Sequence, residues 1–288
     1  MMAITALSIL IPTYNDACMS LVDDLRNQAE RAGIAYEILV ADDGSTDADS
    51  KAVNAAINTL PHCHYIERTE NVGRAAIRNF LAKEAQYPWL LFIDSDMVVC
   101  RQDFLSKYIC CDCETIVDGG VVIGNVKPGN LRAMYEQRHE QEHTVEQRKQ
   151  SPYRDFHTAN FLIRRDIMLQ WPFDERFRYY GYEDVLFGKQ MEQQHIGIVH
   201  IDNPLSFEVY EQNADFISKT EEGLRTLHQF RQELQGYSRL LDIADRVPQK
   251  PIRFWHSLFG RMERYLLTGR HPQLWMFNLY KLGYFASL

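Results

Sequence analysis

The chain has 288 residues, of which 45% are hydrophobic and 24% charged, an ordinary composition for a soluble globular protein. Its net charge of −8 argues against a general nucleic-acid-binding protein, which would carry a basic face. The first residues lack the basic region of a signal peptide, and no apolar run is long enough to span a bilayer. We therefore expect the protein to act in the cytosol.

The six cysteines do not form the disulfide framework of a small secreted domain. Three of them, Cys110, Cys111 and Cys113, follow one another too closely to bridge comfortably. They also lack a partner Cys-x-x-Cys pair for a zinc site. Reduced thiols are the interpretation that we favour.

In chain order, the first half alternates apolar runs with segments of helical spacing. This alternation predicts a mostly parallel sheet with helices on both faces. The predicted strands are 6–12, 36–41, 63–67 and 89–93, and the predicted helices are 17–32 and 73–86.

The second half changes character and ends in a long helical pattern. From about residue 214 the chain reads as helical to its end, with breaks at Pro248 and Pro251. We thus expect one α/β domain with a C-terminal helical extension. Before the extension, the predicted strands are 119–125, 161–163 and 196–201, and the predicted helices are 131–149 and 182–194.

Two carboxylates one residue apart, Asp94 and Asp96, follow the apolar run 89–93. Residues i and i+2 of an extended segment point the same way, so both side chains can converge beyond the strand end. Close carboxylates repel each other unless a cation neutralises them. Mg²⁺ or Mn²⁺, with a substrate diphosphate completing its shell, fits this pair.

Polar clusters also follow the other predicted strands, at Thr13–Asn15 and Asp42–Ser45. The carboxyl ends of parallel strands share one edge of a sheet, where ligands bind. Asp42 and Asp43 can accept hydrogen bonds from a nucleobase or ribose, although one of them could simply cap the turn.

A predicted helix opens at Gly73 and carries Arg74 and Arg78 on one face. Arginines near a helix N-terminus can gather diphosphate oxygens. The alternative is a solvated helix face on which they pair with Glu70 or Glu84.

Together these features resemble the family-2 inverting glycosyltransferases of GT-A fold, over about residues 4–210. The order and spacing of the motifs are far more specific than any one of them. The matching segments are SILIPTYN (8–15), ILVADDGSTD (38–47), NVGRAAIRN (71–79), FIDSDM (92–97), HTANFLIRRDI (157–167) and GYEDVLFG (181–188).

The resemblance implies transfer of a sugar from a nucleotide-diphosphate donor, with UDP-sugars as the first choice, to a glycan or lipid-linked acceptor in polysaccharide assembly. It implies a catalytic domain at 1–212, with a nucleotide-sugar half at about 1–98 and an acceptor half at 99–212, and an extension at 213–288. Asp184 is the expected general base and Glu183 the next candidate, at a helix N-terminus that favours the anion. The expected donor and metal residues are Pro12, Thr13, Tyr14, Asn15, Asp42, Asp43, Asn71, Gly73, Arg74, Arg78, Asp94, Ser95 and Asp96, with Asp94 and Asp96 as the metal ligands.

Two features stand apart from this pattern. Many members of that family place a metal-binding histidine where this chain has Phe207, so Glu208 or a water would have to replace it, or metal binding is weaker. The segment from His139 to His143 is a formal H-E-x-x-H match on a predicted helix. We interpret that match as accidental, because no third zinc ligand with suitable context follows it.

The C-terminal residues 250–288 hold six Lys or Arg, one acidic residue and nine aromatics. Such a helical segment can lie on an anionic membrane surface, or its aromatics can pack as a cap on the catalytic domain.

Two other functions stay open at this point. A sugar nucleotidyltransferase would need a Gly-rich phosphate loop, which Pro12–Asp16 is not. A non-catalytic or decayed nucleotide-sugar-binding protein would suit Phe207. The sugar, the acceptor and the linkage are not evident from the sequence.

Overall fold

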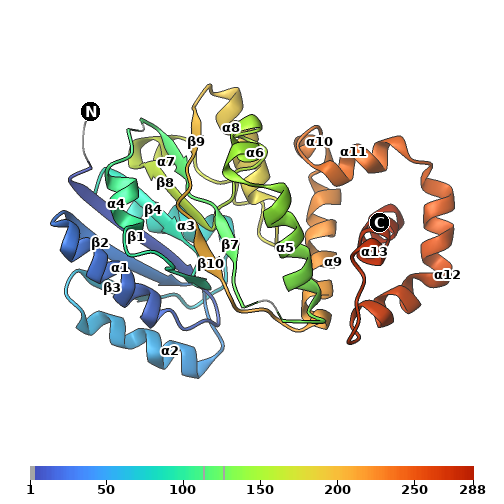
Figure 1. Cartoon of the computed structure of the whole chain (residues 1–288), viewed down its shortest axis with the longest axis horizontal. Coiled ribbons are helices and arrows are strands. Elements are labelled where there is room, and N and C mark those ends of the chain that lie inside the picture. The colour runs from blue at the N-terminus through green and yellow to red at the C-terminus, as the bar shows by residue number, and fades with distance from the viewer. Residues whose placement is uncertain (1–3, 113, 126) are drawn as a thin grey trace.

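The computed structural model describes residues 4–112, 114–125 and 127–288 (Figure 1). Its centre is a seven-stranded sheet in the order β3-β2-β1-β4-β8-β6-β9. Neighbouring strands are parallel except that β8 runs antiparallel to both β4 and β6. The predicted mostly parallel sheet is thus confirmed. The strands are β1 (Ala6–Thr13), β2 (Ala35–Asp42), β3 (Cys63–Glu67), β4 (Trp89–Ile93), β6 (Ile116–Asp118), β8 (Asn160–Arg164) and β9 (Ile198–His200).

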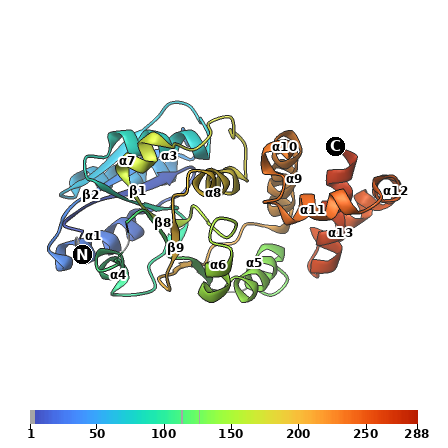
Figure 2. The same ribbon diagram turned by 90° about the horizontal axis from the view of Figure 1, so that it is seen from above.

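Helices cover both faces of this sheet (Figure 2), and β1 shows why. Its side chains alternate: Ile9 packs in the same core as Leu25, whereas Leu10 packs with Leu81 and Phe92 on the other face. The α/β fold expected from the sequence is confirmed. The helices of this part are α1 (Met19–Ala32), α2 (Ala48–Ala55), α3 (Arg74–Glu84), α4 (Phe104–Ile109), α5 (Leu131–Glu142), α6 (Val145–Gln150), α7 (Arg165–Gln170) and α8 (Glu183–Gln193), with a short 3-10 helix at Ala56–Thr59.

A second, three-stranded sheet in the order β5-β10-β7 lies beside the first. Its strands are β5 (Met97–Val98), β10 (Leu205–Phe207) and β7 (Val121–Ile123). The strand predicted at 119–125 falls here and not in the main sheet. Strands of two or three residues are too short for side-chain alternation to reveal, so β5 and β10 were not predicted.

The helix predicted over 131–149 is in fact two helices. Thr144 starts α6 with a capping box in which its side chain and that of Gln147 each bond the other's backbone. A capping box satisfies the free N–H groups of a new helix start. The charge pattern predicts one continuous helix, but the new start at Thr144 separates α5 from α6.

The C-terminal part is helical, as predicted, and forms one end of the molecule (Figures 1 and 2). The break predicted at Pro251 is wrong, because Pro251 lies in the first turn of α12, where a missing N–H costs no helical hydrogen bond. Phe277 and Tyr280 of α13 are buried with Leu131 and Phe216. The helices are α9 (Asn213–Gln229), α10 (Arg231–Leu234), α11 (Arg239–Arg246), α12 (Gln249–Leu267) and α13 (Leu274–Ser287).

Among the described residues, Cys18, Cys63, Cys100 and Cys110 are free thiols. Cys111 is disulfide-bonded, so the expectation of reduced thiols is wrong for that residue. Spacing along the chain does not say which sulfurs the fold brings together. Cys113 lies outside the described residues.

Removal of residues 249–288 is expected to destabilise the protein. The deletion uncovers Leu131 and Phe216, which now pack against Phe277 and Tyr280. Each large apolar side chain returned to water costs about 1.5–3 kcal/mol, so the deletion should lower the melting temperature and promote aggregation. A thermal melt followed by circular dichroism tests this. A shortened chain that melts like the full one would show that the extension is an independent unit.

Candidate active site

A cleft of about 1400 Å³ opens at the carboxyl ends of β1, β2 and β4. It continues past the start of α8 and along α5 and α6. Of the residues predicted to bind donor, metal or acceptor, all but Asp42 line it. Those lining residues are Pro12, Thr13, Tyr14, Asn15, Asp43, Asn71, Gly73, Arg74, Arg78, Asp94, Ser95, Asp96, Glu183 and Asp184.

The two aspartates that end β2 differ in their surroundings. Asp42 is buried and accepts hydrogen bonds from the Ser45 backbone N–H (2.7 Å) and the Tyr65 hydroxyl (2.5 Å). It therefore holds the turn, as one of our two interpretations supposed. Asp43 faces the cleft and accepts from the backbone N–H groups of Val72 and Gly73, each at 2.9 Å. Burial raises the pKa of Asp43.

Asn15 ties the loop after β1 to the loop after β2. Its backbone has a positive φ of 52°, a conformation that asparagine tolerates better than most residues. Its side-chain oxygen accepts from the backbone N–H groups of Thr46 (2.7 Å) and Asp47 (2.9 Å). Asn15 thus fixes the shape of this edge of the cleft.

Gly73 begins α3 with a φ of 92°. A Cβ at this position would lie 2.4 Å from the backbone oxygen of Arg178. Glycine is therefore required by both the backbone angle and the close approach. The turn places Arg74 and Arg78 on the side of α3 that faces the cleft.

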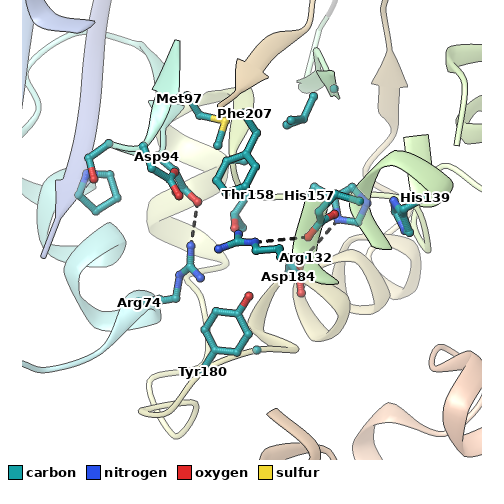
Figure 3. Close-up of a pocket in the computed structure, with 18 of the residues that line it drawn as sticks. Arg74, Asp94, Met97, Arg132, His139, His157, Thr158, Tyr180, Asp184 and Phe207 are labelled. Carbon is teal, nitrogen blue, oxygen red and sulfur yellow. Dashed lines mark hydrogen bonds and ion pairs between the residues drawn. The ribbon is translucent and has the colours of Figure 1, made fainter. Parts of the chain in front are cut away.

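These two arginines join the end of β4 to the start of α8, and Figure 3 shows the contact of Arg74 with Asp94. Arg74 and Arg78 contact the two carboxylate oxygens of Asp94, at 2.8 and 2.5 Å. Both also lie 3.5 Å from one oxygen of Glu183. The Arg78 side chain is only 1% exposed, whereas that of Arg74 is 41% exposed. Pairing of Arg78 with Glu70 or Glu84 on a solvated face is therefore excluded.

Asp96 has the opposite character from Asp94. Burial and the negative charge of Asp94 raise the pKa of Asp96 to about 6, against the opposing effect of Arg74 and Arg132. A carboxylate with this surplus of negative charge suits a divalent cation. The described residues contain no group of three or more His, Cys, Asp or Glu side chains that could hold a metal ion. The Asp94–Asp96 pair would suit an ion held by few protein groups, with ligand oxygens supplying the rest.

Phe207, at the position of the expected histidine, is buried in β10 opposite Met97 of β5. The guanidinium of Arg132 lies 4.2 Å from the centre of its ring. Arg132 is held by Glu211 at 2.5 Å. The guanidinium of Arg132 is therefore near Asp96, on the side where a metal-binding histidine was expected. Glu208 is not among the residues that line the cleft.

The candidate base Asp184 lies across the cleft from Asp94 (Figure 3). Its Oδ2 is 3.6 Å from Nδ1 of His157, and its Oδ1 accepts from the Val185 N–H at 2.8 Å. Partial burial would raise the pKa of Asp184, but His157 outweighs this effect and the pKa is lowered. Burial likewise opposes the charged form of His157, yet Asp184 raises the pKa of the imidazole. Asp184 is thus held as an anion.

Glu183, the second candidate base, is differently placed. Its side chain is 4% exposed and faces both arginines. Burial raises the pKa of Glu183, although Arg74 opposes the shift. Its contacts make it a member of the ion-pair network, whereas the side chain of Asp184 is 23% exposed.

The H-E-x-x-H match lies in the same cleft. The rings of His139 and His143 stack face to face with their centres 3.8 Å apart. His143 also contacts Asp155 at 3.1 Å. Burial lowers the pKa of His139 to about 3. Among the described residues, no group of three or more His, Cys, Asp or Glu side chains is placed to hold a metal ion here.

Sequence reasoning missed the roles of Arg132 and His157. Arg132 sits in a helix crowded with charges, where nothing in the pattern singles it out. His157 opens the quoted segment HTANFLIRRDI, so its position in that motif was a usable signal.

Comparisons with known proteins identify the family and the fold. Residues 8–170 match the family described as Glycosyl transferase family 2. A poly(ribitol-phosphate) beta-glucosyltransferase from Bacillus spizizenii is 36% identical over 105 residues, which are 35% of this chain and 16% of that protein. The match therefore spans well under two thirds of the length of that curated relative.

Two solved structures share the fold. The mannosyltransferase PcManGT from Pyrobaculum calidifontis, in complex with GDP-Man and Mn²⁺, has 16% identity and a TM-score of 0.58 over 97% of this chain and 85% of its own. TarS 1-349 from S. aureus, in complex with UDP-GlcNAc, has 17% identity and a TM-score of 0.53 over 98% and 90%. The expected GT-A fold is confirmed. Because the family match covers more than half of its residues, this chain belongs to glycosyl transferase family 2.

Proposed function

We propose that this protein is a metal-dependent inverting glycosyltransferase. It would transfer a sugar from a nucleotide-diphosphate donor to a hydroxyl of a glycan or lipid-linked acceptor in polysaccharide assembly. One observation carries the proposal: Asp43, Arg74, Asp96 and Asp184 face a single cleft. In that order, these residues would bind the nucleoside, the diphosphate and a divalent cation, and take the proton of the acceptor.

On the donor side, Asp43 would accept hydrogen bonds from the base or ribose. Arg74, which is partly exposed, and Arg132 would contact diphosphate oxygens. Mn²⁺ or Mg²⁺, held by Asp96 with Asp94 next to it, would offset charge on the diphosphate. UDP-sugars remain our first choice, and GDP-sugars come next because the two neighbours described above were solved with UDP-GlcNAc and GDP-Man.

On the acceptor side, Asp184 would take the proton from the attacking hydroxyl. The acceptor oxygen forms its bond to the anomeric carbon while the bond from that carbon to the diphosphate breaks. The nucleoside diphosphate leaves with the bonding electrons, and attack from the opposite side inverts the anomeric centre. His157 would act as a positioning residue that keeps Asp184 anionic.

A second candidate is a nucleotide-sugar-binding protein without transferase activity, for which Phe207 is the supporting observation. A panel of UDP- and GDP-sugars, screened with Mn²⁺ for thermal stabilisation and then for donor hydrolysis, separates the two. Stabilisation with no turnover of any donor, with or without saccharide acceptors, would favour the binding protein.

Asp96→Ala should abolish metal-dependent donor binding and leave the fold intact, because Asp96 follows a strand end and lies outside the core. Calorimetry with UDP or GDP, each with and without Mn²⁺, measures this. The fold is checked by an unchanged melting temperature in the absence of ligand. Equal Mn²⁺-dependent affinity in variant and wild type would remove the metal assignment.

Asp184→Asn should leave donor binding nearly unchanged and slow transfer by roughly two to four orders of magnitude, the usual range for a lost general base. The amide is almost isosteric but cannot take the proton. Single-turnover transfer rates and donor affinity are measured side by side. If the variant keeps most of its rate, the base is another group, with Glu183 the next to test.

His157→Ala should move the acid limb of the pH–rate profile to higher pH. The imidazole lowers the pKa of Asp184, so its removal lets the pKa rise and protonates the base over a wider acidic range. His139→Ala is the matched control, since that ring has no ion pair to Asp184 among the described contacts. The interpretation fails if both variants leave the limb in place, or if both shift it equally.

A further inference from the structure

An apolar strip faces outward on α12 from Phe254 to Leu266. Exposed fractions on this face run from 43% to 78%. The spacing of the residues puts them on one side of a helix. The opposite side, with Gly260, Glu263 and Leu267, is buried. The exposed set is Phe254, Trp255, Leu258, Met262, Tyr265 and Leu266.

The tail sequence allowed two interpretations, a packed cap and a membrane-binding helix. In the structure, α13 fits the first and α12 fits the second. Phe277, Tyr280 and Phe285 of α13 are buried and serve as packing. The exposed aromatics of α12 do not, because α12 contacts α13 and α9 through its other side. In Figures 1 and 2 the helix forms the far edge of the molecule. Its outer face is therefore open within the described chain.

Basic side chains border this face. Lys250 and Arg261 lie beside it in α12, and Arg270 follows the helix; all three are exposed. The one acidic residue of Gln249–Leu267, Glu263, is buried and accepts from the Trp255 indole N–H at 2.7 Å. The tail thus carries a surplus of positive charge in a chain whose net charge is −8. An anionic surface would complement the charge of this tail.

We propose that α12 docks the protein onto an anionic lipid bilayer by lying in the plane of its surface. Amphipathic helices with aromatic and basic residues bind the headgroup region in this way. No helix in the described part of the chain is long and apolar enough to cross a bilayer, so the contact is peripheral. A two-fold contact between copies would instead bring together two faces that are both bordered by the basic residues Lys250 and Arg261.

The docking face is firmly connected to the cleft. Leu267 of α12 is buried with Phe216 and Ile217 of α9, and α9 also supplies Lys219 and Glu222 to the cleft wall. A bilayer bound at α12 therefore fixes the direction in which the cleft opens. The docking does not depend on the proposed transfer activity, and binding to lipid can be measured without donor or acceptor.

The test is co-sedimentation of the full chain with vesicles of phosphatidylcholine alone or mixed with phosphatidylglycerol. We expect binding to the mixed vesicles only, and weaker binding at high salt. Leu258→Glu should weaken it by about tenfold or more, because it puts a charge on the apolar face that would enter the lipid surface. Arg261→Gln should weaken it by about fivefold at low salt. Leu169→Glu, at a similarly exposed leucine of α7, should change nothing.

Melting temperatures of all variants establish that each is folded, and Tyr265→Ser replaces Leu258→Glu if the latter is not. Sedimentation velocity of the same samples gives the oligomeric state. The proposal is overturned if the wild type ignores the mixed vesicles at low salt, or if Leu258→Glu binds as tightly as Leu169→Glu. A dimer that Leu258→Glu dissociates, without vesicle binding, would assign the face to a second copy.

Discussion

The candidate site depends on one buried cation. Arg78 is 1% exposed and contacts Asp94 and Glu183, which belong to the end of β4 and the start of α8. A guanidinium this deeply buried must keep its partners, because a buried charge left unpaired costs several kcal/mol. These ion pairs therefore fix the position of α8, which carries the candidate base, relative to β4. Arg74 extends the same pairing into the cleft.

This constraint separates the roles of the two acidic residues that end β4. Asp94 is neutralised by two arginines, so it orders them and keeps little charge to offer a metal. Asp96 lacks such a partner, and its raised pKa records the imbalance. A short D-x-D motif thus provides one carboxylate that pairs with arginines and one that, under the proposed function, would bind the cation. The same division applies at β2, where Asp42 holds the turn and Asp43 faces the cleft.

Much of this could be predicted from the sequence, for a physical reason. Apolar runs mark buried strands, and parallel strands bring their carboxyl ends to one edge, so residues as distant as Asn15, Asp43 and Asp96 were expected to meet. What was missed depends on contacts made in three dimensions. Nothing local marks Arg132 as the partner of Phe207. Likewise, the tail composition could not say that Phe277, Tyr280 and Phe285 of α13 would be buried while Phe254, Trp255 and Tyr265 of α12 would be exposed.

Phe207 shows how the small sheet adapts the site. Strand β10 pairs with β5, and β5 begins at Met97, directly after Asp96. The side chain of residue 207 therefore lies near Asp96, the candidate metal ligand, where a histidine could also bind the metal. A phenylalanine there cannot ligate, but its ring face attracts a cation, and Arg132 lies over it. The positive charge opposite the diphosphate would then come partly from a fixed guanidinium, which needs no metal to be present.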